Sequence, residues 1–327
     1  MNISIIIITA TILFGIPIFE NTLRWHTDSH FHLSRIHDIS ESIRHFSLPN
    51  SLNMSSFGYS GQAINGMYPY FTLLPFIIIT AWMNPISQYA TINLLFIIVG
   101  SLVNYFVFQK LNKSRSQSLA AVIAIFPIIN IFSAYHLSLQ GVWAIYFTLP
   151  LALLSIKMIY EGQRFYIPLL SMAIATLINI HLVSALIVII FIFLVFLFLM
   201  SQSTAKIKFV INVSYSGLLC IILSAPTLLN LLFFRTSNLT RVNQPLLADN
   251  TMSLEQMIHS LSNLPLSGTS TPELYGYVFI LDVIIFIFWK FFTSITSKYM
   301  VATIIILQLL ISPYFPWDIV QHSPINI

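Results

Sequence analysis

Residues 24–38, RWHTDSHFHLSRIHD, gather ionisable side chains directly behind an apolar run. Aspartate and histidine can take protons as general bases, and arginine can hold phosphate oxygens through charge-assisted hydrogen bonds. Imidazole and carboxylate groups also suit divalent metals such as Zn²⁺ or Mn²⁺. The stretch therefore indicates either proton transfer combined with phosphate binding, or a metal site.

The residue spacing after position 28 predicts a helix with one side turned towards protein. An apolar stripe at helical spacing is formed by Ile36, Ile39, Ile43 and Phe46. Asp28, His32 and Arg35, at positions i, i+4 and i+7, extend the same stripe. Because an unpaired charge turned towards protein is costly, these three residues are the first candidates for a functional site.

Structural roles for the same residues remain open as alternatives. Asp28 could cap the helix by accepting hydrogen bonds from backbone amides of the first turn. Arg35 could simply pair with Asp28 or Asp38. We expect His30, His37 and Asp38 to lie on the opposite, solvated face of the helix.

A dedicated metal site is not favoured by the spacing of its potential ligands. His26, His30, His37 and Asp38 do not follow H-E-x-x-H or another specific ligand pattern. Cys220 is the single cysteine, so the chain has no internal disulfide and no cysteine-based metal site. We expect no cofactor, with a divalent metal as the open alternative.

The composition excludes a soluble domain. Hydrophobic residues make up 57% of the 327 residues and charged residues only 7%, and the mean hydropathy is +0.86. A water-facing surface does not tolerate such values, so we predict an integral, multi-pass plasma-membrane protein surrounded by membrane lipids. The net charge of +4 comes from basic residues dispersed in short loops, which argues against nucleic acid as a partner.

Apolar runs of about 20 residues, the length that crosses a bilayer, predict an all-α polytopic protein with one transmembrane domain over residues 1–327. The expected spans lie near 3–19, 88–109, 117–135, 140–160, 209–234, 274–292 and 299–316. The first run lacks a basic start and a cleavage site, so we interpret it as a retained helix.

Two further apolar segments are interrupted. Residues 166–200 are too long for one span and contain Asn179 and His181, which predicts two short helices that meet there. Three prolines interrupt residues 68–87. Because proline breaks helices, we expect this segment to dip into the membrane and return without crossing.

With that re-entrant segment, the positive-inside rule gives a consistent orientation. The cytoplasmic loops then carry Lys110, Lys113, Arg115, Lys157, Arg164, Lys206, Lys208, Lys290 and Lys298. Residues 20–67 become a first extracytoplasmic loop with an amphipathic helix, and residues 235–273 become a second extracytoplasmic loop. The ionisable side chains gather at this outer face, so we expect any chemistry to be extracytoplasmic.

Several short motifs resemble the bacterial membrane-protein family labelled "6-pyruvoyl-tetrahydropterin synthase-related", within the GT-C type membrane glycosyltransferases. The similar segments are HTDSHFHLSRI (26–36), Pro49, FGYSG (57–61), MYP (67–69) and INIHLVSAL (178–186). The resemblance implies a GT-C-like bundle of about 8–10 transmembrane helices with an extracytoplasmic juxtamembrane helix.

The resemblance also implies an activity. The expected donor is a polyprenyl-phosphate-linked sugar, and the expected acceptor is a glycolipid or a cell-wall polymer. Asp28 would be the general base of an inverting transfer. Phosphate-binding or substrate-binding roles would fall to His32, Arg35, His181, Arg235 and Arg241.

Three other interpretations of the chain stay open. A transporter or flippase of lipid-linked saccharides would use the same arginines without needing Asp28 as a base. A non-catalytic accessory protein would also use these arginines for phosphate without a base, and a truncated, inactive relative is the third possibility. His181 could equally be a structural histidine at a helix end.

Overall fold

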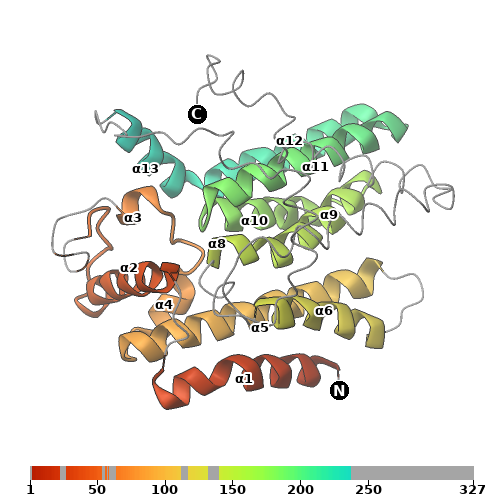
Figure 1. Ribbon diagram of the computed structural model, residues 1–327. Helices are drawn as coiled ribbons and strands as arrows, with labels where there is room; N and C mark the ends of the chain where they lie inside the picture. Colours follow the sequence, from red (N-terminus) through yellow and green to blue (C-terminus); the bar gives the residue numbers. More distant parts are fainter. Residues whose placement is uncertain are drawn as a thin grey trace, which may run out of the picture. The chain divides into compact units, whose positions relative to one another are not determined.

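The computed structural model describes residues 2–22, 27–53, 56, 58, 64–111, 117–131 and 140–236, which are mostly helical and contain no β-strand. The helices are α1 (Asn2–Glu20), α2 (Thr27–Arg44), α3 (Ile64–Met67), α4 (Leu74–Thr80), α5 (Pro85–Leu111), α6 (Gln117–Ile131), α8 (Gln140–Trp143), α9 (Ile145–Tyr160), α10 (Tyr166–Ile178), α11 (Leu182–Gln202), α12 (Lys206–Leu223) and α13 (Ala225–Thr236) (Figure 1). The expected spans near 274–292 and 299–316, and nearly all of the loop 235–273, lie outside the described residues.

Five helical segments in the described part of the chain are long and apolar enough to cross a membrane. They are Asn2–Glu20, Pro85–Leu111, Gln140–Tyr160, Leu182–Gln202 and Lys206–Leu223. The chain is therefore a helical protein with the segments of a multi-pass membrane protein, as its composition predicts.

Helix boundaries confirm one sequence prediction and correct another. The segment 166–200 is interrupted as expected, because α10 ends at Ile178 and α11 begins at Leu182. The expected single span over 209–234 is wrong, because the helix breaks at Ser224 between α12 and α13. Pro226 is consistent with the break, since proline lacks a backbone N–H and fits best in the first turn of a helix, where it lies in α13.

Residues 68–87 do not cross the bundle, as the prolines predict. The hydroxyl of Ser87, at the start of α5, donates to Asn21 Oδ1 over 3.1 Å and lies 3.4 Å from the carbonyl of Ile18, near the end of α1. The chain between α1 and α5 therefore leaves and returns at one end of the helices. This end carries α2, α3, α4 and α13 and is called the α2 end below (Figure 1).

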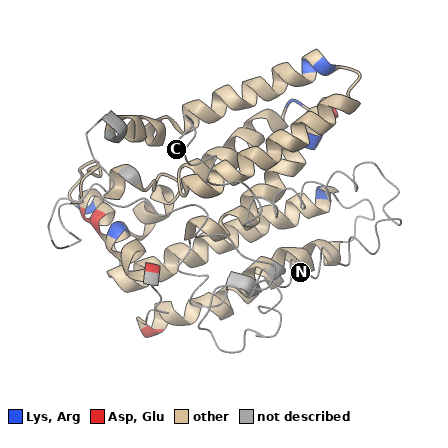
Figure 2. Ribbon diagram, turned by 45° about the horizontal axis from the view of Figure 1, so that its top comes forward, with Lys and Arg blue, Asp and Glu red and all other residues tan. Residues whose placement is uncertain are grey.

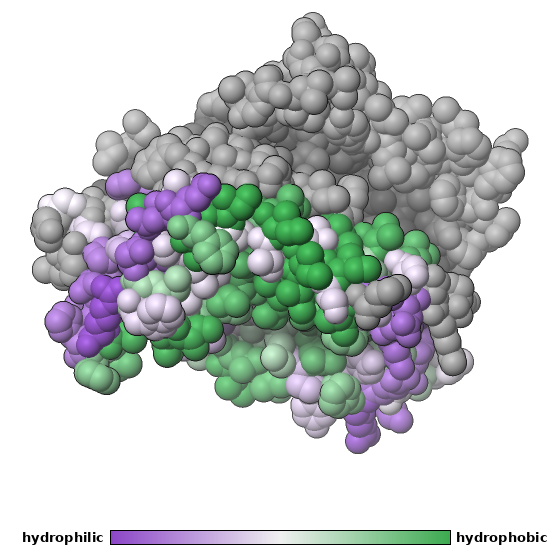
Figure 3. All heavy atoms as spheres, turned by 90° about the horizontal axis from the view of Figure 1, so that it is seen from below, coloured by the Kyte–Doolittle hydropathy of each residue, from purple (hydrophilic) through white to green (hydrophobic). Residues whose placement is uncertain are grey.

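Charged side chains lie mainly at the two ends of the described helices (Figure 2). The opposite end, where Tyr160 Oη lies 3.4 Å from the carbonyl of Gln202, carries Lys110, Lys157, Arg164, Lys206 and Lys208. An apolar surface lies between the two hydrophilic ends on the face seen in Figure 3. This distribution agrees with the orientation that places the α2 end outside.

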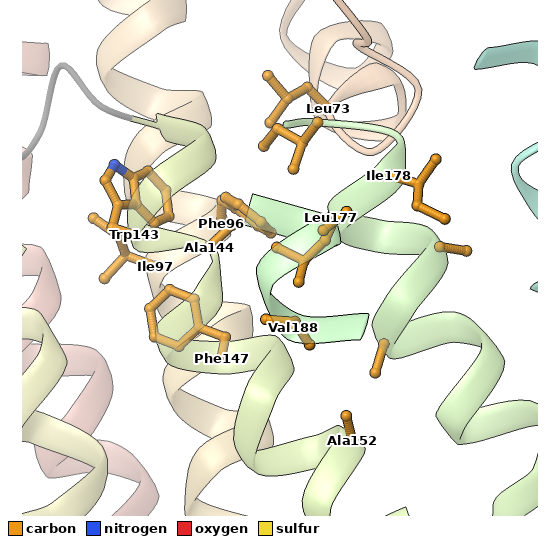
Figure 4. Packing of buried hydrophobic residues seen from close by; sticks show 14 of the residues in the cluster. Leu73, Phe96, Ile97, Trp143, Ala144, Phe147, Ala152, Leu177, Ile178 and Val188 are labelled. Carbon is orange, nitrogen blue, oxygen red and sulfur yellow. The ribbon is translucent and has the colours of Figure 1, made fainter. Parts of the chain in front are cut away.

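The core of the bundle forms around α5, which packs against α1, α6 and α9 and, near its start, against α2 and α4. Phe96 lies with its ring 5.1 Å from that of Trp143 and 6.3 Å from that of Phe147, both from the α8–α9 segment (Figure 4). A Cβ on Gly100 would overlap the Phe147 ring, so glycine permits this close packing.

A side-chain hydrogen bond within the membrane-spanning segment replaces a backbone hydrogen bond that a proline cannot make. Pro150 has no N–H to donate to the carbonyl of Tyr146, one turn earlier in α9. The side chain of Asn104 on α5 donates to that carbonyl instead, over 2.9 Å. Beside this bond lies a cavity of about 300 Å³, lined also by Phe108 and Pro127.

A cysteine-labelling map tests the path of residues 21–84. Leu48, Trp82 and Gln163 are exposed and are replaced one at a time by cysteine in a Cys220→Ala background. A membrane-impermeant maleimide added to intact cells should label L48C and W82C, and should label Q163C only after permeabilisation. Labelling of L48C and W82C from opposite sides would mean that residues 68–87 cross.

Candidate functional site

Helix α2 lies on the bundle through its apolar stripe and two polar anchors. Ile36 and Ile39 are buried as the helical period predicts. The side chain of Gln88, in the first turn of α5, donates to Ser40 Oγ over 2.7 Å. Arg44, in the last turn of α2, donates to the backbone carbonyl of Met83 over 2.6 Å. These contacts fix which side chains of α2 face the protein.

Asp38 is buried, which corrects the expectation of a solvated position. Its carboxylate accepts hydrogen bonds from the side chains of Asn53 over 3.0 Å and Asn65 over 3.3 Å. The chain after α2 folds back over this side of the helix and supplies both amides. Asp38 therefore fastens the connection to α3, while His30 is exposed and His37 half-buried on the same helix.

Arg35 is the most unusual side chain of the site, because it is fully buried and no carboxylate of the described residues pairs with it. Its relative exposure is 0%. Nη1 donates to the carbonyl of Pro69 over 2.9 Å, and the guanidinium carbon lies 4.6 Å from the centre of the Tyr68 ring. Nε is buried and has no hydrogen-bond partner. The alternative in which Arg35 pairs with Asp28 or Asp38 is wrong, since neither lies within ion-pair distance.

Burial lowers the pKa of Arg35 to about 10, and smaller contributions from the neighbouring Tyr68 and Tyr89 oppose this effect. The guanidinium therefore stays protonated at neutral pH. A buried positive charge normally sits beside a negative one. The described part of the chain surrounds this charge with aromatic rings and a carbonyl instead.

His32 and Tyr68 complete the surroundings of Arg35. Nη2 of Arg35 lies 3.2 Å from Nδ1 of His32, one turn earlier on α2. The His32 and Tyr68 rings meet edge to face with centroids 5.7 Å apart. The pKa of His32 is held well below its usual value by burial, with smaller contributions from Arg35 and His181. Sequence reasoning placed His32 correctly on the buried side of α2 but assigned no role to Tyr68.

His181 reaches the same cluster from a distant part of the chain. It is the N-cap of α11, where its Nδ1 accepts the backbone N–H of Ser184 over 3.2 Å. Its ring centroid lies 6.0 Å from that of Tyr68. Burial, and secondarily the charge of Arg35, lower its pKa. The structure thus brings together three of the residues proposed from the sequence, His32, Arg35 and His181.

A polar junction holds His181 and the Tyr68 turn together. The hydroxyl of Thr72 donates to the carbonyl of Thr176, in the last turn of α10, over 2.7 Å. The side chain of Asn179 donates to the carbonyl of Leu223, the last residue of α12, and accepts the hydroxyl of Thr227 over 2.6 Å. The helix breaks at 179–181 and at 224 therefore share one set of hydrogen bonds.

Asp28 lies in the first turn of α2 and is exposed, so the prediction that it turns towards protein is wrong. The helix begins at Thr27, so Asp28 is not the N-cap either. It is still close enough to influence Tyr68, whose pKa is raised by burial, lowered by Arg35 and raised again by Asp28. An exposed carboxylate and a buried guanidinium therefore act on the same phenol.

The remaining candidates are only partly placed. Arg235 belongs to α13, which packs against α3 at the α2 end, but its side chain is outside the described part. Arg241 lies outside the described residues. Within the described ranges, no three His, Cys, Asp or Glu side chains come together as metal ligands. The expectation that the protein works without a metal stays a prediction.

Comparisons of the chain with protein-family models, with curated proteins and with solved structures give no match. The functional argument therefore rests on the geometry of the cluster at the α2 end.

Gly141 tests the placement of His181. A Cβ at position 141 would overlap the Cβ of His181, whereas a Cβ on Gly217 meets nothing within 4 Å. We expect Gly141→Ala to displace His181 and lower the apparent melting temperature in detergent. Gly217→Ala, the matched control, should keep or raise it, since alanine favours a helix by about 1 kcal/mol over glycine. Equal melting temperatures for the two variants would contradict the close contact between Gly141 and His181.

The lowered pKa of His32 predicts an acid sensitivity with a definite sign. Below the ordinary value of 6.5 the unfolded chain binds a proton that the folded chain does not, so stability is lost as the pH falls. His32→Asn keeps an acceptor for Arg35 and should reduce the loss between pH 7.5 and 5.5 by about 1 kcal/mol. Melting curves across this range measure the effect. An unchanged pH dependence in H32N would contradict the burial of a neutral His32.

Proposed function

We propose that the protein is a membrane glycosyltransferase that binds a polyprenyl-phosphate-linked sugar at the α2 end and transfers the sugar to an extracytoplasmic glycolipid or cell-wall polymer. The observation that carries the proposal is the buried guanidinium of Arg35, which has an unpartnered Nε and no carboxylate within ion-pair distance in the described part of the chain. Arginine binds phosphate oxygens more specifically than lysine does.

The position of the cluster supports a lipid substrate. It lies where α2, the 68–73 turn and the start of α11 meet, at one end of helices that are long enough to cross a bilayer. A lipid phosphate occupies this level of a membrane, with its chain running between apolar helices. The lysines at the opposite end support an outer position for the cluster.

The proposed transfer needs one proton acceptor besides the phosphate site. The acceptor hydroxyl oxygen attacks the anomeric carbon while the bond from that carbon to the phosphate oxygen breaks. The electron pair of that bond leaves with the phosphate, and the hydroxyl proton goes to the carboxylate of Asp28. Asp28 is exposed and influences the same Tyr68 as Arg35 does, so an acceptor from the water side can reach it. A single displacement of this kind inverts the anomeric configuration.

A transporter of lipid-linked saccharides is the second candidate, because the buried cluster binds an anion without any help from Asp28. Such a protein, or a non-catalytic accessory protein, would need His32, Arg35 and Tyr68 but no base. Asp28 is therefore the residue that separates the two functions.

Transfer measured in membrane vesicles with a radiolabelled polyprenyl-phosphate sugar tests this separation. Asp28→Asn should lower the transfer rate about 100-fold or more, the usual contribution of a general base, while donor binding stays. Arg35→Gln should abolish binding, and Arg44→Gln should change neither property, because Arg44 is exposed and pairs with Glu41. Full transfer by D28N would contradict the assignment of Asp28 as the general base. Movement of lipid-linked sugar by a wild type that transfers nothing would establish the transporter.

A further inference from the structure

The cavity beside Asn104 lies over α5, between α6 and α9. Its other lining residues are Phe108 from α5, Val122, Ile123 and Pro127 from α6, and Tyr146 and Pro150 from α9. Its volume of about 300 Å³ equals that of about ten water molecules in the liquid. The cavity is therefore large enough to hold one end of a lipid molecule.

This cavity is remote from the cluster around Arg35 and faces the bilayer. Sixteen residues of α5 separate Asn104 from Gln88, which bonds to α2, and this part of the helix is about 24 Å long. Val122, in the cavity wall, is 64% exposed, so the cavity opens on the apolar surface between the two ends of the helices. A ligand therefore enters it from the membrane.

Asn104 brings a hydrogen-bond acceptor to this apolar cavity. The residue is 1% exposed, and its Nδ2 donates to the carbonyl of Tyr146 over 2.9 Å. Because this bond fixes the amide group, Oδ1 is the atom that is left over, and it has no hydrogen-bond partner in the described part of the chain. A buried acceptor without a donor is costly, and the bilayer core holds no water to pair with it.

A proline adds a second acceptor on the opposite wall. Pro127 has no N–H to donate to the carbonyl of Ile123, one turn earlier in α6. Asn104 compensates for the equivalent loss at Pro150 in α9, and Ile123 itself lines the cavity. Oxygen acceptors on α5 and α6 thus lie in the walls of one apolar space, and a ligand with an O–H or N–H group complements them.

We infer that this cavity binds the hydroxyl end of an uncharged lipid alcohol taken from the membrane. The hydroxyl donates to Oδ1 of Asn104, and the apolar chain lies against Phe108 and Val122. Among the lining residues none is charged, so a phosphate or carboxylate would be unpaired there. The site is separate from the phosphate site proposed at Arg35 and does not depend on the proposed transfer.

Photolabelling of the purified full chain in phosphatidylcholine nanodiscs tests where an alcohol binds. The probe is dodecanol with a diazirine on its chain, and the adducts are mapped by mass spectrometry of peptides. We expect the adducts to concentrate on α6 and α9 around the cavity. Adducts spread equally over the exposed apolar residues of α11 and α12 would show an alcohol merely dissolved in the bilayer and would overturn the inference.

Competition by unlabelled lipids tests the chemistry of recognition. Dodecyl methyl ether has the same chain but no donor, so dodecanol should compete at least about fivefold better, the usual effect of leaving a buried acceptor unpaired. Dodecyl phosphate should also compete weakly, because its charge finds no partner in the cavity. Equal competition by the ether would mean that the cavity takes any apolar chain, and equal competition by the phosphate would contradict an uncharged ligand.

A pair of variants isolates Oδ1 of Asn104 from its structural role. Pro150→Ala restores the backbone N–H that bonds to the carbonyl of Tyr146, so α9 no longer needs the Asn104 side chain. P150A alone should keep the preference for dodecanol over the ether. Adding Asn104→Leu should abolish this preference, with folding checked by melting curves of both variants. A double variant that still prefers dodecanol would overturn the assignment.

Discussion

The burial of Arg35 is the constraint around which the α2 end is organised. A fully buried guanidinium must have its N–H groups occupied and its charge balanced. The carbonyl of Pro69 and Nδ1 of His32 occupy two of its donors, and the face of Tyr68 stabilises its charge. These contacts join α2 to the 68–73 turn. They leave Nε without a hydrogen-bond partner, and among the described residues no carboxylate pairs with the charge.

Hydrogen bonds at the other helix breaks also help to position the side chains around Arg35. Asn179 joins the start of α13 to the end of α10, and Thr72 fastens the 68–73 turn to α10. At the break between α10 and α11, the hydrogen bond from the backbone N–H of Ser184 fixes the orientation of the His181 ring. Interrupted helices expose backbone groups that a bilayer cannot hydrate. At this end those groups bond to polar side chains, which places a polar site at the edge of an apolar bundle.

The sequence predicted the burial of His32 and Arg35 on α2 correctly, but it failed at Asp28 and Asp38. Helical periodicity placed His32 and Arg35 against the protein because Ile36 and Ile39 continue their stripe. The same period failed for Asp28, which lies in the first turn and is exposed. It failed for Asp38 in the opposite sense, because Asn53 and Asn65 cover that position from a later part of the chain. Periodicity describes one helix and carries no information about which segments fold over it.

Long-range contacts explain what else the sequence could not supply. The polar interruption at 179–181 predicted that His181 lies between two helices. The proximity of the His181 and Tyr68 rings depends instead on the position of the 68–73 turn in the fold.

The most direct test of the central claim is an experimental structure of the full chain with a polyprenyl methyl phosphate bound. The account predicts the phosphate within hydrogen-bond distance of Arg35 Nε, with His32 and His181 beside it. A carboxylate of the chain itself paired with Arg35, and the lipid phosphate elsewhere, would contradict it.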